Sequence, residues 1–496
     1  MRGYGAALPG TAAAPGCPDT ATGGLRGPDG LRALTEVALD ALAGGTAARG
    51  GPLPAGGPEG VAARVGPVCD PLLPEHGIGA RTALYEIVRA VAEGAADPGH
   101  PWCAGHLHCP PLAVAAAAEL AAAALNPSMD SWDQAPAATV VEERVTAALA
   151  RLVHPDRPRP DALLTGGGTE SNLVALLLAR ERAGRRGART VRVLCGANAH
   201  HSVHRAAWLL GLPAPVTVAC RAGRMVPAEL DRALRGAEGP ALVVATAGTT
   251  DEGLIDPLPE LAEITARYGA ELHVDAAYGG PLLFSERLAE RLRGIGSAVS
   301  VTLDLHKLGW QPIAAGVLAV SDTGLLEPLS ARADYLNAED DTEAGLPDLL
   351  GRSLRTSRRP DALKIAVTLR ALGRAGLGAL VEHCVDSAEG LAARIDTHPG
   401  LRRRPGPVGI STVLFRPVAA DALPGARGDA CVAAVRRRLL DEGRAVLGRA
   451  VAEDADGRPA LWLKTTLLHP QAGPADFDAL LDLVADTTSA DGPAPG

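Results

Sequence analysis

Residues 298–320 read Ala298-Val-Ser-Val-Thr-Leu-Asp-Leu-His-Lys-Leu-Gly-Trp-Gln-Pro-Ile-Ala-Ala-Gly-Val-Leu-Ala-Val320. Two apolar runs, Val299 to Leu303 and Ala314 to Val320, are typical of buried strands, and the polar crossing between them carries His306 and Lys307. Only three of the chain's 48 lysines and arginines are lysines, so a lysine at a strand end is distinctive. A desolvated lysine can lose its proton and bond to a carbonyl carbon, whereas arginine cannot; an ion-pairing role for Lys307 fits this stretch equally well.

Strands and helices alternate on the N-terminal side of this stretch. We predict strands within residues 162–165, 191–195, 216–219, 241–250 and 271–278, and helices within residues 169–180, 198–210, 227–234 and 259–268. The alternation predicts an α/β domain with a mainly parallel sheet, in which ligands bind at the C-terminal ends of the strands. Thr246, Asp275 and Lys307 stand at such ends.

A glycine turn, Gly166-Gly-Gly-Thr169, joins the first of these strands to its helix. Glycines let backbone N–H groups approach an anion, and a helix N-terminus carries about half a positive charge. The turn is neither Gly-x-Gly-x-x-Gly nor a Walker loop, which disfavours nucleotide binding. It predicts a phosphate cradle only in combination with other groups, since many such turns have no ligand.

The rest of the chain divides by composition into four segments. Residues 1–60 are rich in Gly, Ala and Pro and are predicted to be disordered or linker, apart from a short helix at 31–43. Residues 61–110 form a helical segment, residues 111–375 the large domain, and residues 376–490 a smaller α+β domain.

Composition limits the classes of function. The net charge of −9 argues against a broad surface for nucleic acid or anionic membrane. The eight cysteines are scattered without a Cys-x-x-Cys pair, which fits a reducing compartment. Because no signal peptide and no apolar run of about 18 residues is recognisable, we expect a soluble, cytoplasmic protein.

The loop from His100 to Pro111 contains Cys103, His106, His108 and Cys109. These residue types suggest zinc, but their spacing matches no common finger or ribbon, and all four would crowd within seven residues. We therefore predict no metal site, and favour a loop that faces the substrate.

One cofactor explains the polar residues at the strand ends together. Pyridoxal phosphate (PLP) needs an amine that bonds to its aldehyde, a carboxylate at its ring nitrogen, a flat group that stacks on the ring and a helix N-terminus for its phosphate. Lys307, Asp275, His200 and the glycine turn supply one of each on successive βα units. Asp275 alone could be a helix cap and His200 a core histidine, but their joint occurrence predicts a PLP site.

The sequence resembles the group II PLP decarboxylases, a family that includes aromatic amino acid, glutamate and diaminobutyrate decarboxylases. The resemblance is carried in order by Thr165–Asn172, Ala199–Val203, Ala245–Thr250, His273–Tyr278 and Asp304–Lys307. It implies a PLP-dependent transferase type I (aspartate aminotransferase-like) fold, with a seven-stranded sheet in the large domain and a small α+β C-terminal domain. It also implies a homodimer with its active site at the interface and the N-terminal segment packed on the partner subunit.

The resemblance further implies a role for each site residue. Lys307 would be the Schiff-base lysine and Asp275 the partner of the ring nitrogen, with His200 stacked on the ring and Ala277 beneath it. The phosphate would lie among Gly168, Thr169, Ser300 and His306, and the ring hydroxyl near Thr246.

Within the family the likeness is strongest to the L-2,4-diaminobutyrate and siderophore-type diamine decarboxylases, through Asn126–Gln134, His306–Ile313 and Arg355–Lys364. Pro360 and His469 depart from that branch. The implied reaction converts a diamino acid (2,4-diaminobutyrate, ornithine or lysine) into an amine and CO₂.

The groups that would contact the substrate follow less directly. Tyr335 is the nearest tyrosine for the proton that Cα receives, with His200 or Lys307 as alternatives. Arg359, His106 and His108 are candidates for substrate binding, and Asp130, Asp133 and the acidic loop 339–343 for a distal ammonium group.

Three other functions fit the same residues. An aminotransferase or an oxidative decarboxylase-deaminase would use the same lysine, and a non-catalytic regulatory paralogue would keep only the fold. The presence of Lys307, Asp275 and His200 argues against the paralogue.

Overall fold

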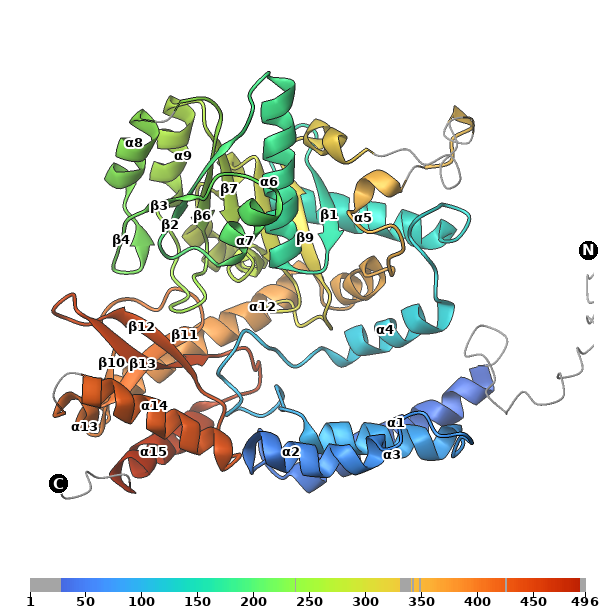
Figure 1. Ribbon diagram of the computed structural model, residues 1–496, viewed down its shortest axis with the longest axis vertical. Coiled ribbons are helices and arrows are strands. Elements are labelled where there is room, and N and C mark those ends of the chain that lie inside the picture. Colours follow the sequence, from blue (N-terminus) through green and yellow to red (C-terminus); the bar gives the residue numbers. More distant parts are fainter. Residues whose placement is uncertain are drawn as a thin grey trace, which may run out of the picture. The chain divides into compact units, whose positions relative to one another are not determined.

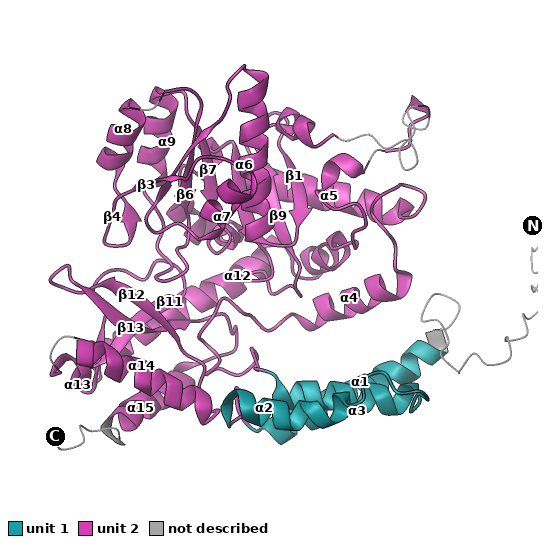
Figure 2. Cartoon of the chain, in the orientation of Figure 1, with its two compact units in different colours: residues 1–50, 56–95 teal, residues 51–55, 96–496 magenta. Residues whose placement is uncertain are grey.

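The computed structural model describes residues 28–330 except Ala237, residues 340, 343–347 and 349–423, and residues 426–490 (Figure 1). Two compact units are distinguished in Figure 2. One contains the residues up to Gly50 together with Gly56–Ala95, and the other contains Gly51–Ala55 and the chain from Ala96 onward. Each unit is described by itself.

The first unit consists of helices α1 (Pro28–Arg49), α2 (Gly57–Val65) and α3 (Ala80–Gly94). The helix predicted at 31–43 is confirmed and is longer than predicted, since residues 28–49 form one continuous helix. The linker was therefore predicted to begin too early, at Gly44. Gly44 and Gly45 suggested a helix end, but a Cβ atom on Gly45 would collide with the carbonyl oxygen of Arg89 in α3. The glycine therefore allows α1 and α3 to pack closely.

A seven-stranded sheet forms the centre of the second unit, in the order β1-β9-β8-β7-β6-β2-β3. Only β9 runs antiparallel to its neighbours, so the predicted mainly parallel seven-stranded sheet is confirmed. The strands are β1 (Asp161–Thr165), β2 (Arg192–Gly196), β3 (Val216–Val218), β6 (Ala241–Thr246), β7 (Glu271–Asp275), β8 (Ser300–Asp304) and β9 (Gly316–Val320). A two-stranded ribbon, β4 (Cys220–Arg221) and β5 (Arg224–Met225), follows β3.

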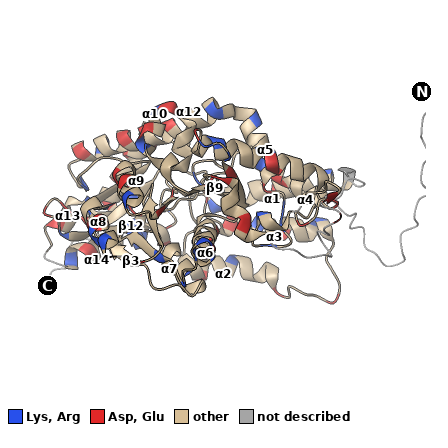
Figure 3. Cartoon of the chain, turned by 90° about the horizontal axis from the view of Figure 1, so that it is seen from above, with Lys and Arg blue, Asp and Glu red and all other residues tan. Residues whose placement is uncertain are grey.

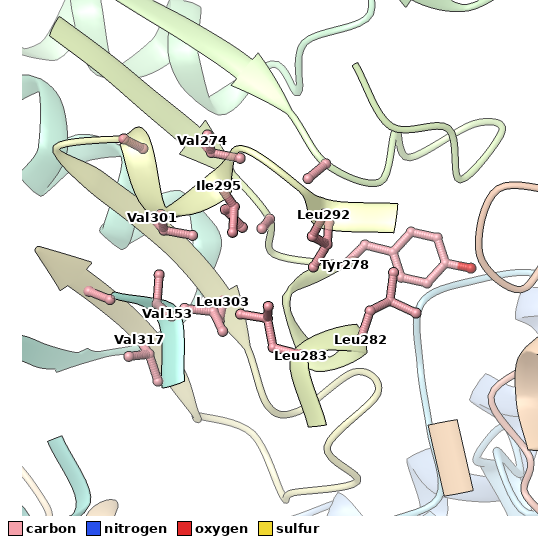
Figure 4. Close-up of a cluster of buried hydrophobic side chains, with 14 of the residues drawn as sticks. Val153, Val274, Tyr278, Leu282, Leu283, Leu292, Ile295, Val301, Leu303 and Val317 are labelled. Carbon is pink, nitrogen blue, oxygen red and sulfur yellow. The ribbon is translucent and has the colours of Figure 1, made fainter. Parts of the chain in front are cut away.

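Helices cover both faces of this sheet because its strands are apolar on both sides. Leu242 and Val244 pack with α6 (Gly168–Arg185) and α7 (Ser202–Leu209). Val243 and Ala245 belong to the core on the other face, part of which is drawn in Figure 4. That core includes residues of α5 (Pro136–Val153), α8 (Pro227–Arg235), α9 (Leu258–Arg267), α10 (Glu286–Ala289) and α12 (Ala362–Thr397). Helix α4 (Ala113–Leu125) packs on α12.

A second, antiparallel sheet has the order β10-β11-β13-β12. Its strands are β10 (Leu401–Arg403), β11 (Thr412–Pro417), β12 (Gly448–Glu453) and β13 (Pro459–Thr466), and its helices are α13 (Val418–Asp421), α14 (Ala426–Asp441) and α15 (Pro474–Ala490). The boundary predicted between residues 375 and 376 falls inside α12, just after a non-helical Gly373 (φ 63°). The domain boundary itself stays a prediction.

Tyr278 joins the two sheets. Its ring lies at the edge of the large core with the hydroxyl group directed away from that core (Figure 4). The hydroxyl accepts a hydrogen bond from the backbone N–H of Ser411 (3.0 Å) and lies 3.0 Å from Thr412 Oγ1. Tyr278 is three positions after Asp275, so the second sheet is attached to the strand end that carries a predicted site residue.

In the view of Figure 3, the positions of basic and acidic residues are both scattered along the ribbon among uncharged ones. Among the described helices, none combines the length and apolar character needed to cross a bilayer.

Candidate active site

The site lies where β6, β7 and β8 end side by side. Val274 and Val301 point into the core on one face of the sheet, so Asp275 and Ser300, their neighbours along the strands, face α6 on the other. Thr246 is the register partner of Asp275. Strand alternation thus places Thr246 and Asp275 on one face at the C-terminal edge of a parallel sheet, as predicted. Ser300 is on the same face but begins β8, level with His273.

Lys307 stands in the turn that follows β8. Its Nζ atom is 2.9 Å from Oδ2 of Asp304, whose side chain is 3% exposed, while that of Lys307 is 18% exposed. The turn is fixed by hydrogen bonds from the Cys109 thiol to the carbonyl oxygen of His306 (3.2 Å) and from Gln311 N to Leu305 O (3.0 Å). The lysine amine is therefore held at the site beside one buried carboxylate, yet remains accessible to a reactant.

Asp275 is buried at the end of β7 and both of its carboxylate oxygens are held. Asn172 Nδ2 in α6 donates a hydrogen bond to Oδ2 (2.7 Å), and the backbone N–H of Ala277 donates to Oδ1 (3.1 Å). The carboxylate is thus held in one orientation, which suits a partner for a single fixed cation.

His200 begins the turn before α7. Burial lowers the pKa of its ring, and the positive charge of Lys307 lowers it further. The carboxylates of Asp275 and Asp304 act in the opposite direction. Hydrogen bonds connect His200 to Asp275 through Ser202 and Asn172, so its ring lies near that carboxylate. A neutral, flat imidazole at this position is suited to stack on an aromatic ring.

The glycine turn supplies a cradle. Helix α6 begins at Gly168, where a Cβ atom would lie 3.0 Å from Ala277 Cβ and 3.2 Å from Asp304 Oδ2. A side chain would fill this space, which leaves the N-terminal backbone N–H groups of the helix open to an anion. His306, whose pKa is lowered by burial, lies against Gly167 and receives the backbone N–H of Ala315 on Nδ1 (3.3 Å).

PLP fits these groups. The buried hydroxyl oxygen of Thr246 has no hydrogen-bond partner among the described residues, and it lies one strand away from Asp275. A ring with a polar substituent, bound between His200 and Ala277 with its phosphate at Gly168, would use both the orphaned hydroxyl and the open helix N-terminus. The amine, the carboxylate, the flat ring and the anion cradle that PLP requires all occur within this one site.

Other predicted residues have different surroundings. The side chains of His106 and His108 are exposed on their loop. Neighbouring groups exclude some solvent from the His106 ring, and this desolvation and the charges of Lys464 and Arg436 lower its pKa. Arg359 forms an ion pair with Glu119 (2.9 Å). Their substrate roles stay predictions.

The candidates for binding a distal ammonium group are largely engaged elsewhere. Asp130 accepts a hydrogen bond from Gln134 Nε2 (2.8 Å), and Asp133 from the Ser131 hydroxyl (2.6 Å). Tyr335 and most of the 339–343 loop lie outside the described residues.

Several site residues were missed from the sequence. Asn172 and His273 lie within the motifs quoted above, yet nothing in the sequence connects residues one hundred positions apart. Asp256 is also buried; it accepts hydrogen bonds from Thr246 N and Met225 N, both 2.8 Å, and so fixes the end of β6. It lies in a loop that reads only as a turn, and no local signal marks it.

Comparison with known proteins assigns the family. Residues 79–416, more than half of the chain, match the pyridoxal-dependent decarboxylase conserved domain. The chain belongs to the pyridoxal-dependent decarboxylase family. It is 45% identical over 425 residues to the L-2,4-diaminobutyrate decarboxylase of Rhizobium meliloti (strain 1021), covering 84% of each chain. It is also 34% identical over 423 residues to the L-2,4-diaminobutyrate decarboxylase of Acinetobacter baumannii, covering 80% of this chain and 81% of that protein.

A solved decarboxylase structure has the same fold. It is the glutamate decarboxylase domain of diaminobutyrate-pyruvate transaminase and L-2,4-diaminobutyrate decarboxylase from Vibrio parahaemolyticus. The TM-score is 0.79 at 29% identity, over 94% of this chain and 97% of that one. The predicted fold type I, the PLP cofactor and the assignment as a PLP-dependent amino acid decarboxylase, a carboxy-lyase, are therefore confirmed.

Proposed function

We propose that this decarboxylase acts on L-2,4-diaminobutyrate, releasing CO₂ and leaving 1,3-diaminopropane. The observation that carries the proposal is the 45% identity, over 84% of both chains, to a relative named for that substrate. A second relative with the same name supports it at 34% identity. Ornithine and lysine, which the sequence left open, receive no such specific support.

In this proposal each residue at the strand ends contacts one part of the cofactor. Lys307 holds the cofactor through its amine, Asp275 keeps the ring nitrogen protonated, and His200 and Ala277 enclose the ring. Gly168, Thr169 and His306 hold the phosphate, and the Thr246 hydroxyl lies near the ring oxygen. Ser300, also predicted near the phosphate, is 2.8 Å from His273 Nδ1 instead. When bound, the cofactor supplies an electron-accepting ring that stabilises the negative charge left at Cα by departing CO₂.

Reprotonation of Cα needs a donor. Lys307 is one proposed donor, because Asp304 Oδ2, 2.9 Å from Nζ, holds its amine at the site. His200 and Tyr335 remain the other proposed donors. In each case the proton moves from a side chain of this chain to the carbon that lost CO₂.

A cationic substrate also needs a counter-charge. A cavity of about 620 Å³ borders His200 and is lined by Asp251, Glu252 and Glu453. Glu252 is paired with Arg404 (2.7 Å) and Asp251 with Lys464 (3.9 Å), so Glu453 is the carboxylate we propose for the distal ammonium group.

The proposed function is tested by product analysis. Purified protein with added PLP is offered 2,4-diaminobutyrate, ornithine, lysine, aspartate and an aromatic amino acid, and CO₂, amine, aldehyde and keto acid are measured. We expect 1,3-diaminopropane and CO₂ in equal amounts, with kcat/KM for diaminobutyrate at least about tenfold above ornithine, because one methylene group is worth about 10–200-fold.

Other products would select the alternatives. A keto acid without CO₂ would indicate an aminotransferase, and an aldehyde an oxidative decarboxylase-deaminase. No turnover and no bound cofactor would indicate the regulatory paralogue.

We also propose a homodimer whose interface completes the site. Exposed apolar side chains support it, including Ile313 (71% exposed) near Lys307, Leu125 and Val140 in the second unit, and Leu39 and Val91 in the first. Sedimentation should give about 101 kDa, twice 50.5 kDa. A fully active 50.5 kDa monomer would contradict the proposal.

A cytoplasmic location is part of the same proposal. Cys69, Cys109, Cys195, Cys220 and Cys384 are free thiols, as expected in a reducing compartment.

A further inference from the structure

A continuous chain of hydrogen bonds runs behind the site, on the α6 face of the sheet. It links Ser300 to His273 (2.8 Å), His273 to Asn172 (3.0 Å), Asn172 to Ser202 (2.8 Å) and Ser202 to His200 (2.8 Å). Asn172, His273 and Ser202 are fully buried, so solvent does not compete for these bonds. The side-chain amide of Asn172 connects this chain of bonds to Asp275, because it also donates a hydrogen bond to that carboxylate.

The chemistry of the carboxylate fixes the direction of every bond. Asp275 Oδ2 accepts, so the group of Asn172 that faces it at 2.7 Å must be the NH₂ group. The amide oxygen of Asn172 then faces Thr302 Oγ1 and His273 Nε2, both at 3.0 Å, and accepts from each. His273 therefore carries its proton on Nε2, and burial lowers its pKa to about 4, which keeps the ring neutral.

The second hydrogen of the Asn172 amide group determines which ring nitrogen of His200 carries the proton. It is donated to Ser202 Oγ, which leaves the serine hydroxyl hydrogen free to be donated to His200 Nδ1. The backbone N–H of Ser202 also points at Nδ1 (3.3 Å). Since Nδ1 receives two donors, the neutral ring carries its proton on Nε2.

We propose that Asn172 is a positioning residue for decarboxylation, whose single amide group orients Asp275 directly and, through Ser202, sets His200 in the tautomer with its proton on Nε2. The proposal rests on the proposed function for its purpose, since His200 would stack on the cofactor with an N–H donor at its Nε2 edge. The hydrogen bonds themselves can be tested in the protein without cofactor or substrate.

The first test is nitrogen NMR of the apoprotein labelled with ¹⁵N-histidine. The His200 signals are identified by their loss in His200→Gln. We expect Nδ1 to be unprotonated and Nε2 protonated in the natural chain and in Ser202→Thr, which keeps the hydroxyl. Ser202→Ala leaves only the longer backbone hydrogen bond on Nδ1 and should therefore increase the population of the tautomer with its proton on Nδ1. Asn172→Ala should do the same, because Ser202 then loses the donor that orients it.

The pH dependence provides a second readout. The groups that act on His200 are Asp275, Asp304, Lys307 and His201, and all are retained in these variants. A hydroxyl donor on Nδ1 stabilises the neutral ring, so its loss raises the pKa of His200. In Ser202→Ala the ring should titrate about half a pH unit or more higher, the shift expected from one lost hydrogen bond.

A matched control removes a buried hydroxyl outside the chain of bonds. Thr265 in α9 donates only to its own helix (Ala262 O, 2.9 Å), and Thr265→Val should leave the His200 signals unchanged. Bound-cofactor measurements complete the test, since Asn172→Ala should weaken PLP affinity at least about tenfold while Ser202→Thr retains it.

Two outcomes would overturn the inference. One is a proton on Nδ1 of His200 in the natural chain, and the other is an unchanged tautomer in both Ser202→Ala and Asn172→Ala. If the NMR pattern is as expected but diaminobutyrate is not decarboxylated, only the proposed substrate fails.

Discussion

Replacing Lys307 by alanine should abolish decarboxylation, with a loss of at least about 10⁴-fold in kcat, and should remove any visible absorbance band that the natural protein shows with PLP. The reason is that no other described amine lies beside Asp304 and the glycine turn. Lys307→Arg is the matched variant, because arginine keeps the charge for the ion pair with Asp304 Oδ2 but cannot bond to the aldehyde. It should be equally inactive.

Borohydride reduction locates the bond directly. The chain has only two other lysines, Lys364 and Lys464, so a mass spectrum of the digested protein can assign the reduced adduct without ambiguity. Lys364 is buried against Glu119 (3.1 Å), and Lys464 donates to Thr250 O (3.0 Å). An adduct on either of these lysines, or full activity in Lys307→Ala, would refute the assignment of Lys307.

Replacing Asp275 by asparagine should lower kcat by about 10² to 10⁴-fold. Breaking a buried charge pair costs about 3–5 kcal/mol, and each 1.36 kcal/mol corresponds to a factor of ten in rate. The substitution keeps the size of the side chain, and its one oxygen can accept from Asn172, but the backbone N–H of Ala277 then faces an NH₂ group, so some stability should also be lost. Steady-state rates and thermal melting of the variant, measured together, separate the two effects.

Asp161→Asn is the control for Asp275. Asp161 is also a partly buried carboxylate of the same sheet, paired with Arg352 (2.7 Å), but it begins β1 and so lies at the opposite end of the strands. Burial raises the pKa of Asp161, but Arg352 outweighs burial and the pKa is lowered overall. Removing the Asp161 charge should therefore reduce the stability of the fold and not kcat. A comparable loss of kcat in both variants at equal stability would contradict a specific role for Asp275.

The sequence predicted those parts of the site that follow from local patterns. Strand alternation and the scarcity of lysine pointed to Lys307, and the polar ends of β6 and β7 pointed to Thr246 and Asp275. The structure brings these residues together with His200 and Gly168. Their roles remain proposals, whereas the sheet and the cofactor are established by the topology and by the family.

The features missed from the sequence depend on contacts across long separations. Gly45 looked like a helix terminator because its effect depends on α3, about forty residues away. Asn172 looked like one more polar residue in the first turns of a helix, since its partners come from β7, β8 and α7. The surroundings of His106 and Arg359 are likewise set by Lys464, Arg436 and Glu119, which no periodicity relates to them.

The hydrogen bonds of Tyr278 have a consequence for how sequences of this kind can vary. The Tyr278 hydroxyl is buried, and its pKa is raised to about 12 mainly by burial, so it stays uncharged at any physiological pH. Its bonds to Ser411 and Thr412 attach the strand end that bears Asp275 and Ala277 to the second sheet. The identity of residues 411 and 412 therefore affects the cofactor site, although neither Ser411 nor Thr412 is among the residues assigned to bind the cofactor. Substitutions in the C-terminal third of the chain should therefore be tolerated on its outer helices, whereas substitutions of Ser411 or Thr412 should impair the site.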